Sequence, residues 1–366
     1  MPTVNEYLRD DAIRHAVDFD RYARGVVQRM VAVLNRADAR IAAELAVRLA
    51  DIDAGQQTTT LLEAVLASVR QLNAQAYQVI GRELTAELQA LAGVESEYVG
   101  ELLRTAIPVQ VSVTTVTAEQ AYAAAMARPF QGVLLREALA DLEDGHARRF
   151  RDAIRQGFVE GKTTQAIVRE IRGTRARQYT DGIVQMDRRR LEAVVRTALS
   201  HTAAVAREQV YDANPDLIKG FRWTSTLDLR TTEPCRIRDG RLYDRDRKPV
   251  GHSIPWLAGP GRLHWNCRST EIIVTPSYRE LGLDIDEVPP GTRASMDGQV
   301  PADRSYADWI KAQSAARQDE ILGPSRGKLL RAGGLSLDDL YSRRGEPLTL
   351  DELRDRHRAA FERAGV

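Results

Sequence analysis

Cysteine, aromatic residues and long apolar runs are all scarce in this chain. Only two cysteines occur among 366 residues, and phenylalanine, tryptophan and tyrosine together make up 6% of the sequence. So few cysteines argue against a disulfide framework and fit a reducing compartment. No apolar run approaches the roughly 20 residues that a membrane helix needs, and residues 1–11 lack a signal-peptide pattern. We therefore expect a protein with no membrane partner that is assembled in the cytoplasm.

The charge that is present is unevenly spread. The formal net charge is +1, yet residues 1–147 carry 13 basic and 20 acidic side chains. Residues 148–207 carry 14 basic and 6 acidic side chains, and residues 219–268 carry 11 and 5. A basic region can attract phosphate groups. It can equally be a solvated helix surface that pairs with the acidic front of the chain or with a partner protein.

Hydrophobic periodicity predicts a mainly helical protein. Apolar residues recur at three- and four-residue steps among many alanines and arginines, as is typical of amphipathic helices. We expect helices over residues 5–53, 61–91, 96–106, 134–158 and 187–213, and in the tail over residues 306–313, 315–322, 326–332 and 349–364. Residues 109–116 alternate apolar and polar β-branched types, which predicts one strand.

The rarest residue types gather between Trp223 and Cys267. This stretch holds both cysteines, two of the six histidines and three of the four tryptophans. We expect strands over residues 220–226, 242–243 and 268–274, because these segments alternate or are bounded by turn residues. Together they would form a small antiparallel sheet against the preceding helix and bury the tryptophans. The fold class is therefore α+β, mainly α, with long helices that flank the sheet.

The conspicuous residues of this stretch follow a fixed order. The pattern Trp-Thr-Ser-Thr-Leu-Asp-x-Arg-Thr begins at Trp223, Cys-x-x-x-Asp-Gly begins at Cys235, and His-x-Asn-Cys-Arg begins at His264. In this order the three motifs resemble the conserved domain of the phage Mu F-like minor head proteins, which are head morphogenesis proteins. The resemblance divides the chain into a helical N-terminal region over residues 1–130, a head morphogenesis domain over residues 131–276 and a helical C-terminal extension over residues 277–366.

The resemblance also implies a function and a set of partners. It implies a minor capsid protein of a tailed phage, assembled in the host cytoplasm and bound in the interior of the head near the portal. Its work there would be to assist procapsid assembly and DNA packaging or delivery. The expected partners are the portal protein and the major capsid or scaffolding protein, with packaged DNA as a further candidate.

We assign two groups of residues to the expected fold and to the expected binding of partners. The fold-defining residues of the motif are Trp223, Asp228, Arg230, Asp239, Gly240, Asn266 and Arg268. The candidates for binding DNA or a partner are Arg188, Arg189, Arg190, Arg245, Arg247 and Lys248.

The motif also contains candidate metal ligands. Cys235, His264 and Cys267 are residue types that zinc binds, and the spacing of His264 and Cys267 is typical of a ligand pair. Many members of the family that the chain resembles look to have another cysteine three residues before Cys235, where this chain has Thr232. In this chain, the fourth coordination position of a tetrahedral zinc site would therefore lack the cysteine that the resemblance implies.

Three interpretations of these residues stay open. In the first, zinc is bound and either His252 or Asp239 supplies the fourth ligand. In the second, no cofactor is bound, because the two cysteines are buried as small apolar residues and His264 bonds a carbonyl or carboxylate. In the third, Cys235 and Cys267 form a disulfide, against which cytoplasmic assembly argues.

An enzyme is the last alternative. Cys267 and His264 could form a nucleophile and base pair, but residues three apart on a strand point to opposite faces unless a turn intervenes. Asp244 and Asp246 lie in a charged run that is typical of a solvated loop. We therefore expect no enzymatic activity. A DNA-binding module inside the virion and a virion-carried enzyme or toxin remain the alternatives to a structural role.

Overall fold

The computed structural model describes residues 4–53, 59–107, 111–276, 292–301 and 303–366. The chain forms two compact units. The first unit comprises Met1–Phe19, Glu95–Thr117 and Ala204–Val366, and the second comprises Asp20–Val94 and Ala118–Ala203. The expected class, mainly α with a small antiparallel sheet, is confirmed. The division at residues 130 and 276 stays a prediction.

The described residues before the sheet form helices, four of which are long, as the periodicity predicts. They are α1 (Val4–Asp53), α2 (Thr59–Ala106), α3 (Ala118–Ala127), α4 (Leu135–Val159), α5 (Thr164–Arg172) and α6 (Ile183–Ala213), with a 3-10 turn η1 (Arg175–Arg177) before α6. The expected break near Gly93 is wrong, because α2 continues through it. A side chain at Gly93 would meet Cβ of Ala118 at 3.1 Å. This glycine therefore allows α3 to approach α2 closely and does not end a helix.

The strand expected over residues 109–116 is also wrong for the part that the structure describes. Residues 111–117 have no regular structure, and residues 108–110 lie outside the described residues. The backbone of Thr114 bonds a side chain and not a neighbouring strand: its N–H donates to Oδ1 of Asn214 at 2.7 Å, and its carbonyl accepts from Nδ2 at 2.9 Å. Val111, Val113 and Val116 still pack against the core, which accounts for the apolar positions in this segment.

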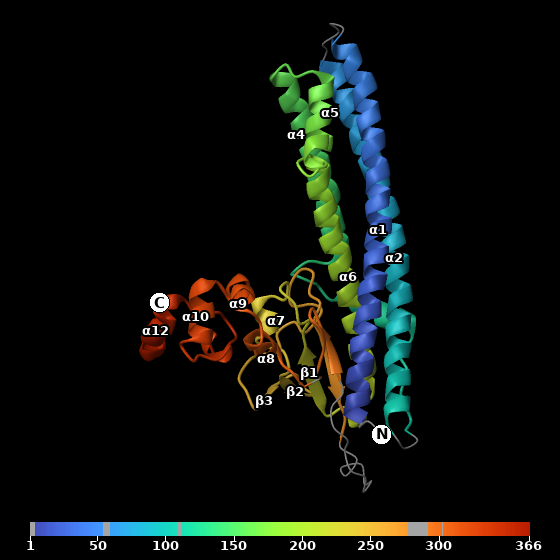
Figure 1. Ribbon diagram of the computed structural model, residues 1–366. Coiled ribbons are helices and arrows are strands. Elements are labelled where there is room, and N and C mark those ends of the chain that lie inside the picture. The colour runs from blue at the N-terminus through green and yellow to red at the C-terminus, as the bar shows by residue number, and fades with distance from the viewer. Residues whose placement is uncertain (1–3, 54–58, 108–110, 277–291, 302) are drawn as a thin grey trace. The chain divides into compact units, whose positions relative to one another are not determined.

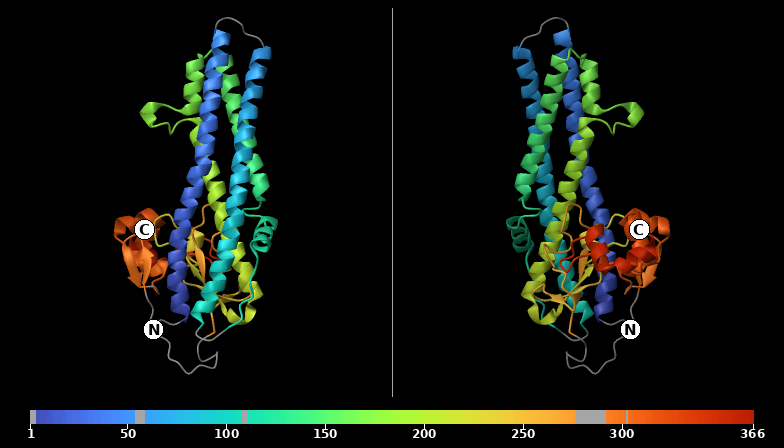
Figure 2. Two further views of the ribbon diagram at one scale, coloured as in Figure 1. Left: turned by 90° about the vertical axis from the view of Figure 1, so that its right-hand side faces the viewer. Right: turned by 90° about the vertical axis from the view of Figure 1, so that its left-hand side faces the viewer.

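The core of the second unit lies between α1, α2, α4, α5 and α6. The first, second, fourth and sixth helices of the chain run side by side in this unit (Figures 1 and 2). Thr163 caps α5, because its side chain accepts from the backbone N–H of Ala166. Gly157 lets α5 pack on α4, since a side chain there would lie 2.5 Å from Cγ1 of Ile167. The cap at Thr163 and the small size of Gly157 thus hold α5 against α4.

The sheet belongs to the first unit. After the 3-10 turn η2 (Pro215–Leu217) come β1 (Gly220–Thr224), α7 (Glu233–Arg236), β2 (Leu242–Asp244), β3 (Pro249–Val250) and β4 (Thr270–Val274). The antiparallel order is β3-β2-β1-β4, with Phe221 opposite both Tyr243 and Ile273. Trp223 is fully buried, and its ring meets that of Trp256 edge-on at a centroid distance of 5.3 Å. The three expected strands and the burial of Trp223 and Trp256 are therefore confirmed, whereas the expected burial of Trp265 is wrong, because 40% of its surface is exposed.

The tail forms a second core that the motif helps to build. It contains a hairpin of β5 (Thr292–Ser295) and β6 (Gly298–Pro301), then α8 (Tyr306–Lys311), α9 (Ala315–Leu322), α10 (Pro324–Arg331), η3 (Asp338–Leu340), α11 (Leu350–Arg356) and α12 (Arg358–Ala364). The hairpin was not expected from the sequence, and the single terminal helix that was expected breaks at His357. The hairpin lies beside these helices (Figure 2), and Leu227, Ile237 and Ile254 of the motif share their core. The tail and the motif therefore fold as one body.

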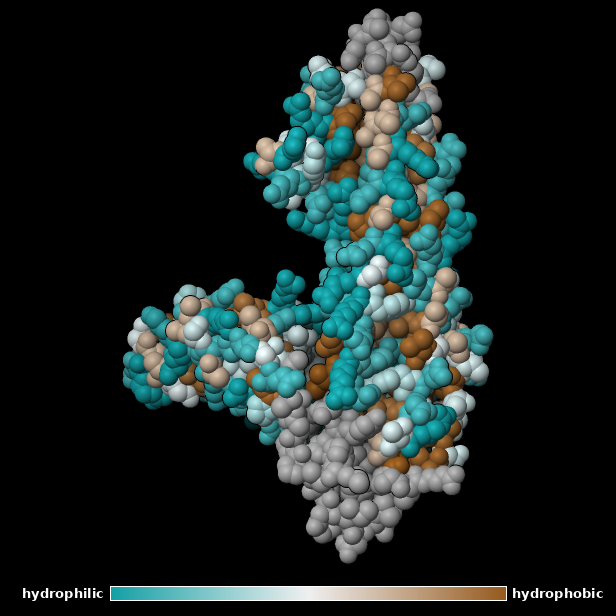
Figure 3. All heavy atoms as spheres, turned by 45° about the vertical axis from the view of Figure 1, so that its right-hand side comes forward, coloured by the Kyte–Doolittle hydropathy of each residue, from teal (hydrophilic) through white to brown (hydrophobic). Residues whose placement is uncertain are grey.

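None of the helices in the described part of the chain is long and apolar enough to cross a bilayer. On the face drawn in Figure 3, hydrophilic residues cover most of the described surface, with hydrophobic residues interspersed among them.

A buried ion-pair network joins four segments of the first unit. Arg207 of α6 donates to Glu271 of β4 and to Glu95 of α2, in both cases at 2.8 Å. Glu95 also contacts Nε2 of His15 of α1 at 2.8 Å. Burial alone would raise the pKa of Glu95, but the charge of Arg207 and the bond to His15 outweigh it and lower the pKa. The network therefore favours the ionised form of Glu95 inside the unit.

We predict that Arg207→Ala removes about 3–5 kcal/mol from the free energy of unfolding, because two buried carboxylates lose their counter-charge. Urea denaturation followed by circular dichroism measures this loss. Arg196→Ala is the matched control on the same helix, since Arg196 pairs with the half-exposed Glu192 at 3.3 Å and should cost no more than about 1 kcal/mol. Equal losses in the two variants would show that the network adds no stability.

Candidate functional site

Two tight turns bring the three candidate ligands of the motif and Thr232 together. In the first turn, which opens α7, the N–H of Cys235 donates to the carbonyl of Thr232 at 3.0 Å. In the second, the N–H of Cys267 donates to the carbonyl of His264 at 3.1 Å, and Asn266 between them has a left-handed φ of 59°. Each turn places residues three apart on the same side. The turn needed to bring His264 and Cys267 together is therefore present.

The side chains from the two turns meet. Sγ of Cys235 lies 3.7 Å from Sγ of Cys267 and 3.2 Å from Nε2 of His264. Oγ1 of Thr232 lies 2.7 Å from the same Nε2. Both cysteines are buried and free, because a disulfide would need about 2.05 Å between the sulphurs. Three candidate metal ligands and one hydroxyl thus surround a common point.

The two thiols and the imidazole influence each other's protonation. The bond between the thiols raises the pKa of Cys235, and burial adds to this effect. The same bond lowers the pKa of Cys267 well below its usual range, and His264 strengthens the effect against the opposing influence of burial. Burial alone would lower the pKa of His264, but Cys267 raises it. Of the two thiols, Cys267 therefore has the lowered pKa and Cys235 the raised one.

The two fourth ligands that the sequence suggested point elsewhere. Nε2 of His252 contacts the carbonyl of Leu242 at 2.8 Å, and its Nδ1 accepts from the N–H of Ile254 at 3.2 Å. Asp239 is occupied by a separate network. Within the described ranges, Cys235, His264 and Cys267 form the one group of three or more His, Cys, Asp or Glu side chains whose donor atoms all lie within 4.8 Å of one another. The side chain that lies beside these three ligands is that of Thr232.

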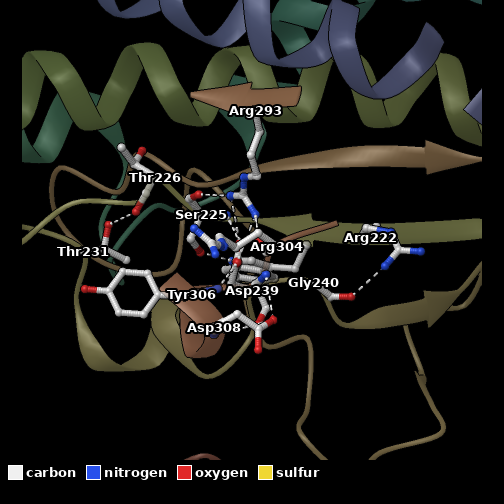
Figure 4. Close-up of polar contacts among 12 residues, drawn as sticks. Arg222, Ser225, Thr226, Thr231, Asp239, Gly240, Arg293, Arg304, Tyr306 and Asp308 are labelled. Carbon is white, nitrogen blue, oxygen red and sulfur yellow. Dashed lines mark hydrogen bonds and ion pairs between the residues drawn. The ribbon is translucent and has the colours of Figure 1, made fainter. Parts of the chain in front are cut away.

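Asp239 is the centre of a buried hydrogen-bond network (Figure 4). Its carboxylate accepts from the N–H of Ser225 at 2.6 Å, from the N–H of Tyr306 at 2.7 Å, and from both terminal nitrogens of Arg293 at 3.1 and 3.2 Å. These donors come from the end of β1, the start of α8 and β5. The next residue, Gly240, has a φ of 78° and donates its N–H to the carbonyl of Trp223 at 2.8 Å. The motif's Asp-Gly step therefore binds the tail to the sheet.

A second carboxylate fixes the loop after β1. Asp228 pairs with both terminal nitrogens of Arg268, at 2.6 and 2.8 Å, and accepts from the N–H groups of Arg230 and Thr231 at 3.0 Å each. Burial alone would raise the pKa of Asp228, but the bonds and charge of Arg268 lower it. The side chain of Arg230 is exposed, and only its backbone takes part. This pair ties the first motif to the last.

The six basic residues proposed to bind DNA or a partner fall into two groups in different units. Residues 188–190 lie on α6 in the second unit. Arg245, Arg247 and Lys248 lie between β2 and β3 in the first. The guanidinium of Arg247 stacks over Phe221 at 3.7 Å, and Lys248 pairs with Asp246 at 3.3 Å. Arg247 therefore helps to cover the sheet's aromatic core.

A buried polar cluster in the second unit was not expected from the sequence. Nε2 of His146 on α4 lies 3.3 Å from Asp38 of α1 and 3.7 Å from Asp187 of α6. Arg149 pairs with Asp187, and the ring of Tyr77 on α2 meets His146 edge-on. Burial raises the pKa of Tyr77, and both carboxylates add to the shift. The members are spread over residues 38–187 and share no local motif, so spacing alone could not reveal them.

An arginine-lined cavity in the second unit was not expected either. It has a volume of about 340 Å³, and its lining includes Arg169, Arg172, Arg175 and Tyr179. Arg172 lies over the ring of Tyr179 at 5.9 Å. None of these three arginines has a carboxylate partner in the described part of the chain. The excess of basic residues over residues 148–207 pointed to this region but not to these side chains.

We predict that Asp239→Asn destabilises the first unit by about 3–5 kcal/mol, because Arg293 stays buried without its counter-charge. Limited proteolysis should then cut the tail helices faster than β1, since the network joins the two. Asp338→Asn is the control: Asp338 pairs with Arg241 at 2.7 Å but is largely exposed, and its loss should cost no more than about 1 kcal/mol. Unchanged protection of the tail in Asp239→Asn would contradict this account.

Comparison with known proteins identifies the region that contains this site. Residues 148–272 match the model of a family described as Phage Mu protein F like protein. The match begins in α4, includes the sheet through Ile272 and contains the whole stretch from Trp223 to Arg268. No curated protein and no solved structure matches the chain. The family is the one that the motifs resemble, and it suggests a phage head morphogenesis protein. Residues 148–272 of this chain are therefore similar to the Phage Mu protein F like family, as the motifs indicated.

Proposed function

We propose that the chain is a minor capsid protein of a tailed phage, bound at the portal vertex inside the head. There it assists procapsid assembly and DNA packaging or delivery. The observation that carries this proposal is the family match over residues 148–272, which includes every motif residue from Trp223 to Arg268. The partners that follow from it are the portal protein and the major capsid or scaffolding protein.

The contacts of the motif support a structural role over a catalytic one. The carboxylates of Asp228 and Asp239 are both engaged by arginines and backbone N–H groups of the same unit. Cys267, which has the most nucleophilic environment, is only 2% exposed. A reactive cysteine must be accessible to its substrate. The polar groups of the motif thus hold the fold together.

An exposed aromatic residue of the motif offers a contact for a partner. Trp265 follows His264 directly, and 40% of its surface is exposed. Leu257, in the loop that precedes it, is 60% exposed and has a left-handed φ of 59°. Tryptophan is enriched among the residues that dominate protein interfaces. We assign Trp265 to the contact with the portal.

The test is capture of the purified chain by the portal ring, with the major capsid and scaffolding proteins tested in parallel. The wild-type chain should bind the portal, and Trp265→Ala should weaken binding at least about tenfold, as is typical of a central interface residue. Val250→Ala is the control, because Val250 is similarly exposed, at 49%, but lies on the edge strand β3. Failure of the wild-type chain to bind any head component would refute the proposal.

A DNA-binding module is the second candidate function, and the arginine-lined cavity favours it. Arginines without carboxylate partners beside a tyrosine are suited to phosphate groups. The triple variant Arg169→Ala, Arg172→Ala and Arg175→Ala should weaken binding to duplex DNA. It should also reduce the slope of log K against log salt by about 0.9 for each phosphate group that it no longer neutralises. Arg358→Ala in α12 is the control, and equal salt slopes for the triple variant and the wild-type chain would exclude this surface.

A further inference from the structure

We propose that Cys235, His264 and Cys267 bind one zinc ion and that Thr232 faces its fourth coordination position. The inference concerns the internal chemistry of the motif and does not depend on the proposed role in the phage head. Three observations carry it: the distances between the donor atoms, the orientation of the histidine ring and the backbone turns that present the four side chains.

The distances fit a tetrahedral ion. Zinc with Zn–S bonds of about 2.3 Å and a Zn–N bond of about 2.0 Å places two sulphurs about 3.8 Å apart and a sulphur and a nitrogen about 3.5 Å apart. The sulphurs of Cys235 and Cys267 lie 3.7 Å apart, and Sγ of Cys235 lies 3.2 Å from Nε2 of His264. All three donor atoms lie within 4.8 Å of one another. Small side-chain adjustments are therefore enough to bring the three ligands around one ion.

The histidine ring is oriented as a metal ligand is. Nδ1 of His264 contacts the carbonyl of Trp265 at 2.9 Å, so in the neutral ring the N–H is on Nδ1. The lone pair of Nε2 then points toward Cys235 and Thr232. Histidines that bind zinc commonly donate their other N–H to a backbone carbonyl, which fixes the tautomer and the ring orientation.

The backbone presents the ligands in two pairs. Each turn offers the side chains of positions i and i+3, first Thr232 and Cys235, then His264 and Cys267. The four side chains around the ion therefore come from two short segments. One runs from just before α7 into it, and the other precedes β4. The ion would bridge these segments within the first unit. Such a link closes a loop of the chain that contains β2 and β3.

The fourth coordination position distinguishes this site from a structural zinc site with four protein ligands. A threonine hydroxyl is a weak zinc ligand, and structural sites use four cysteine or histidine side chains. With Thr232 at this corner, the ion has three protein ligands and a position that water can fill. We therefore assign Thr232 as the residue that limits the affinity of the site.

The experiment measures zinc in the full-length chain purified without chelators, together with cobalt(II) titrations that report thiolate coordination by absorption. We expect about one zinc per wild-type chain and a thiolate-to-cobalt charge-transfer band. Both should be lost in His264→Ala and Cys267→Ser. His252→Ala is the control and should keep both, because the bonds of His252 go to backbone groups nearby.

Thr232→Cys keeps the test decisive if the ligand variants fail to fold. It completes a set of three cysteines and one histidine, so zinc affinity in competition with a chromogenic chelator should rise at least about tenfold. A folded wild-type chain without zinc and without the cobalt band would overturn the proposal. So would unchanged affinity in Thr232→Cys, or a thiol assay that finds Cys235 and Cys267 joined as a disulfide.

Discussion

The first unit depends on one buried carboxylate. Asp239 lies out of contact with water, where an ionised group without partners would be very costly. Its donors are Arg293, the N–H of Ser225 and the N–H of Tyr306, and two of these three come from the tail. The carboxylate is therefore satisfied only when the tail is docked. This couples the folding of residues after 292 to that of the motif, although the family match ends at residue 272.

Local sequence signals predicted most of the fold but not the features that tertiary contacts decide. The long helices and the three strands around the motif follow from periodicity and turn chemistry. Gly93 looked like a helix end, yet it serves the close approach of Ala118. The alternation over residues 111–116 looked like a strand, yet Asn214 takes the place of a strand partner. In both cases the deciding contact comes from a segment that a local reading does not include.

In the candidate site, too, the sequence predicted what local residue patterns decide and missed what tertiary contacts decide. Rare residue types in a fixed order were sufficient to single out Cys235, His264 and Cys267 as a group, and the structure places their donor atoms within 4.8 Å of one another. The residue that lies beside these three could not be predicted, because His252 and Asp239 are engaged by contacts that depend on the folded backbone. The other polar cluster, around His146, has members on four helices and leaves no pattern in the sequence.

Two buried polar networks bear on how such long helices find their register. An alanine-rich apolar stripe tolerates a slip of one turn, because the residues that meet after the slip are again small and apolar. Asp38, His146 and Asp187 in the second unit would move apart in such a slip, as would Arg207 and Glu95 in the first. A charge left buried without a partner costs several kcal/mol, whereas the apolar stripe changes little. The networks therefore penalise wrong registers more than they stabilise the right one, and a protein with helices of 50 and 48 residues has many wrong registers to exclude.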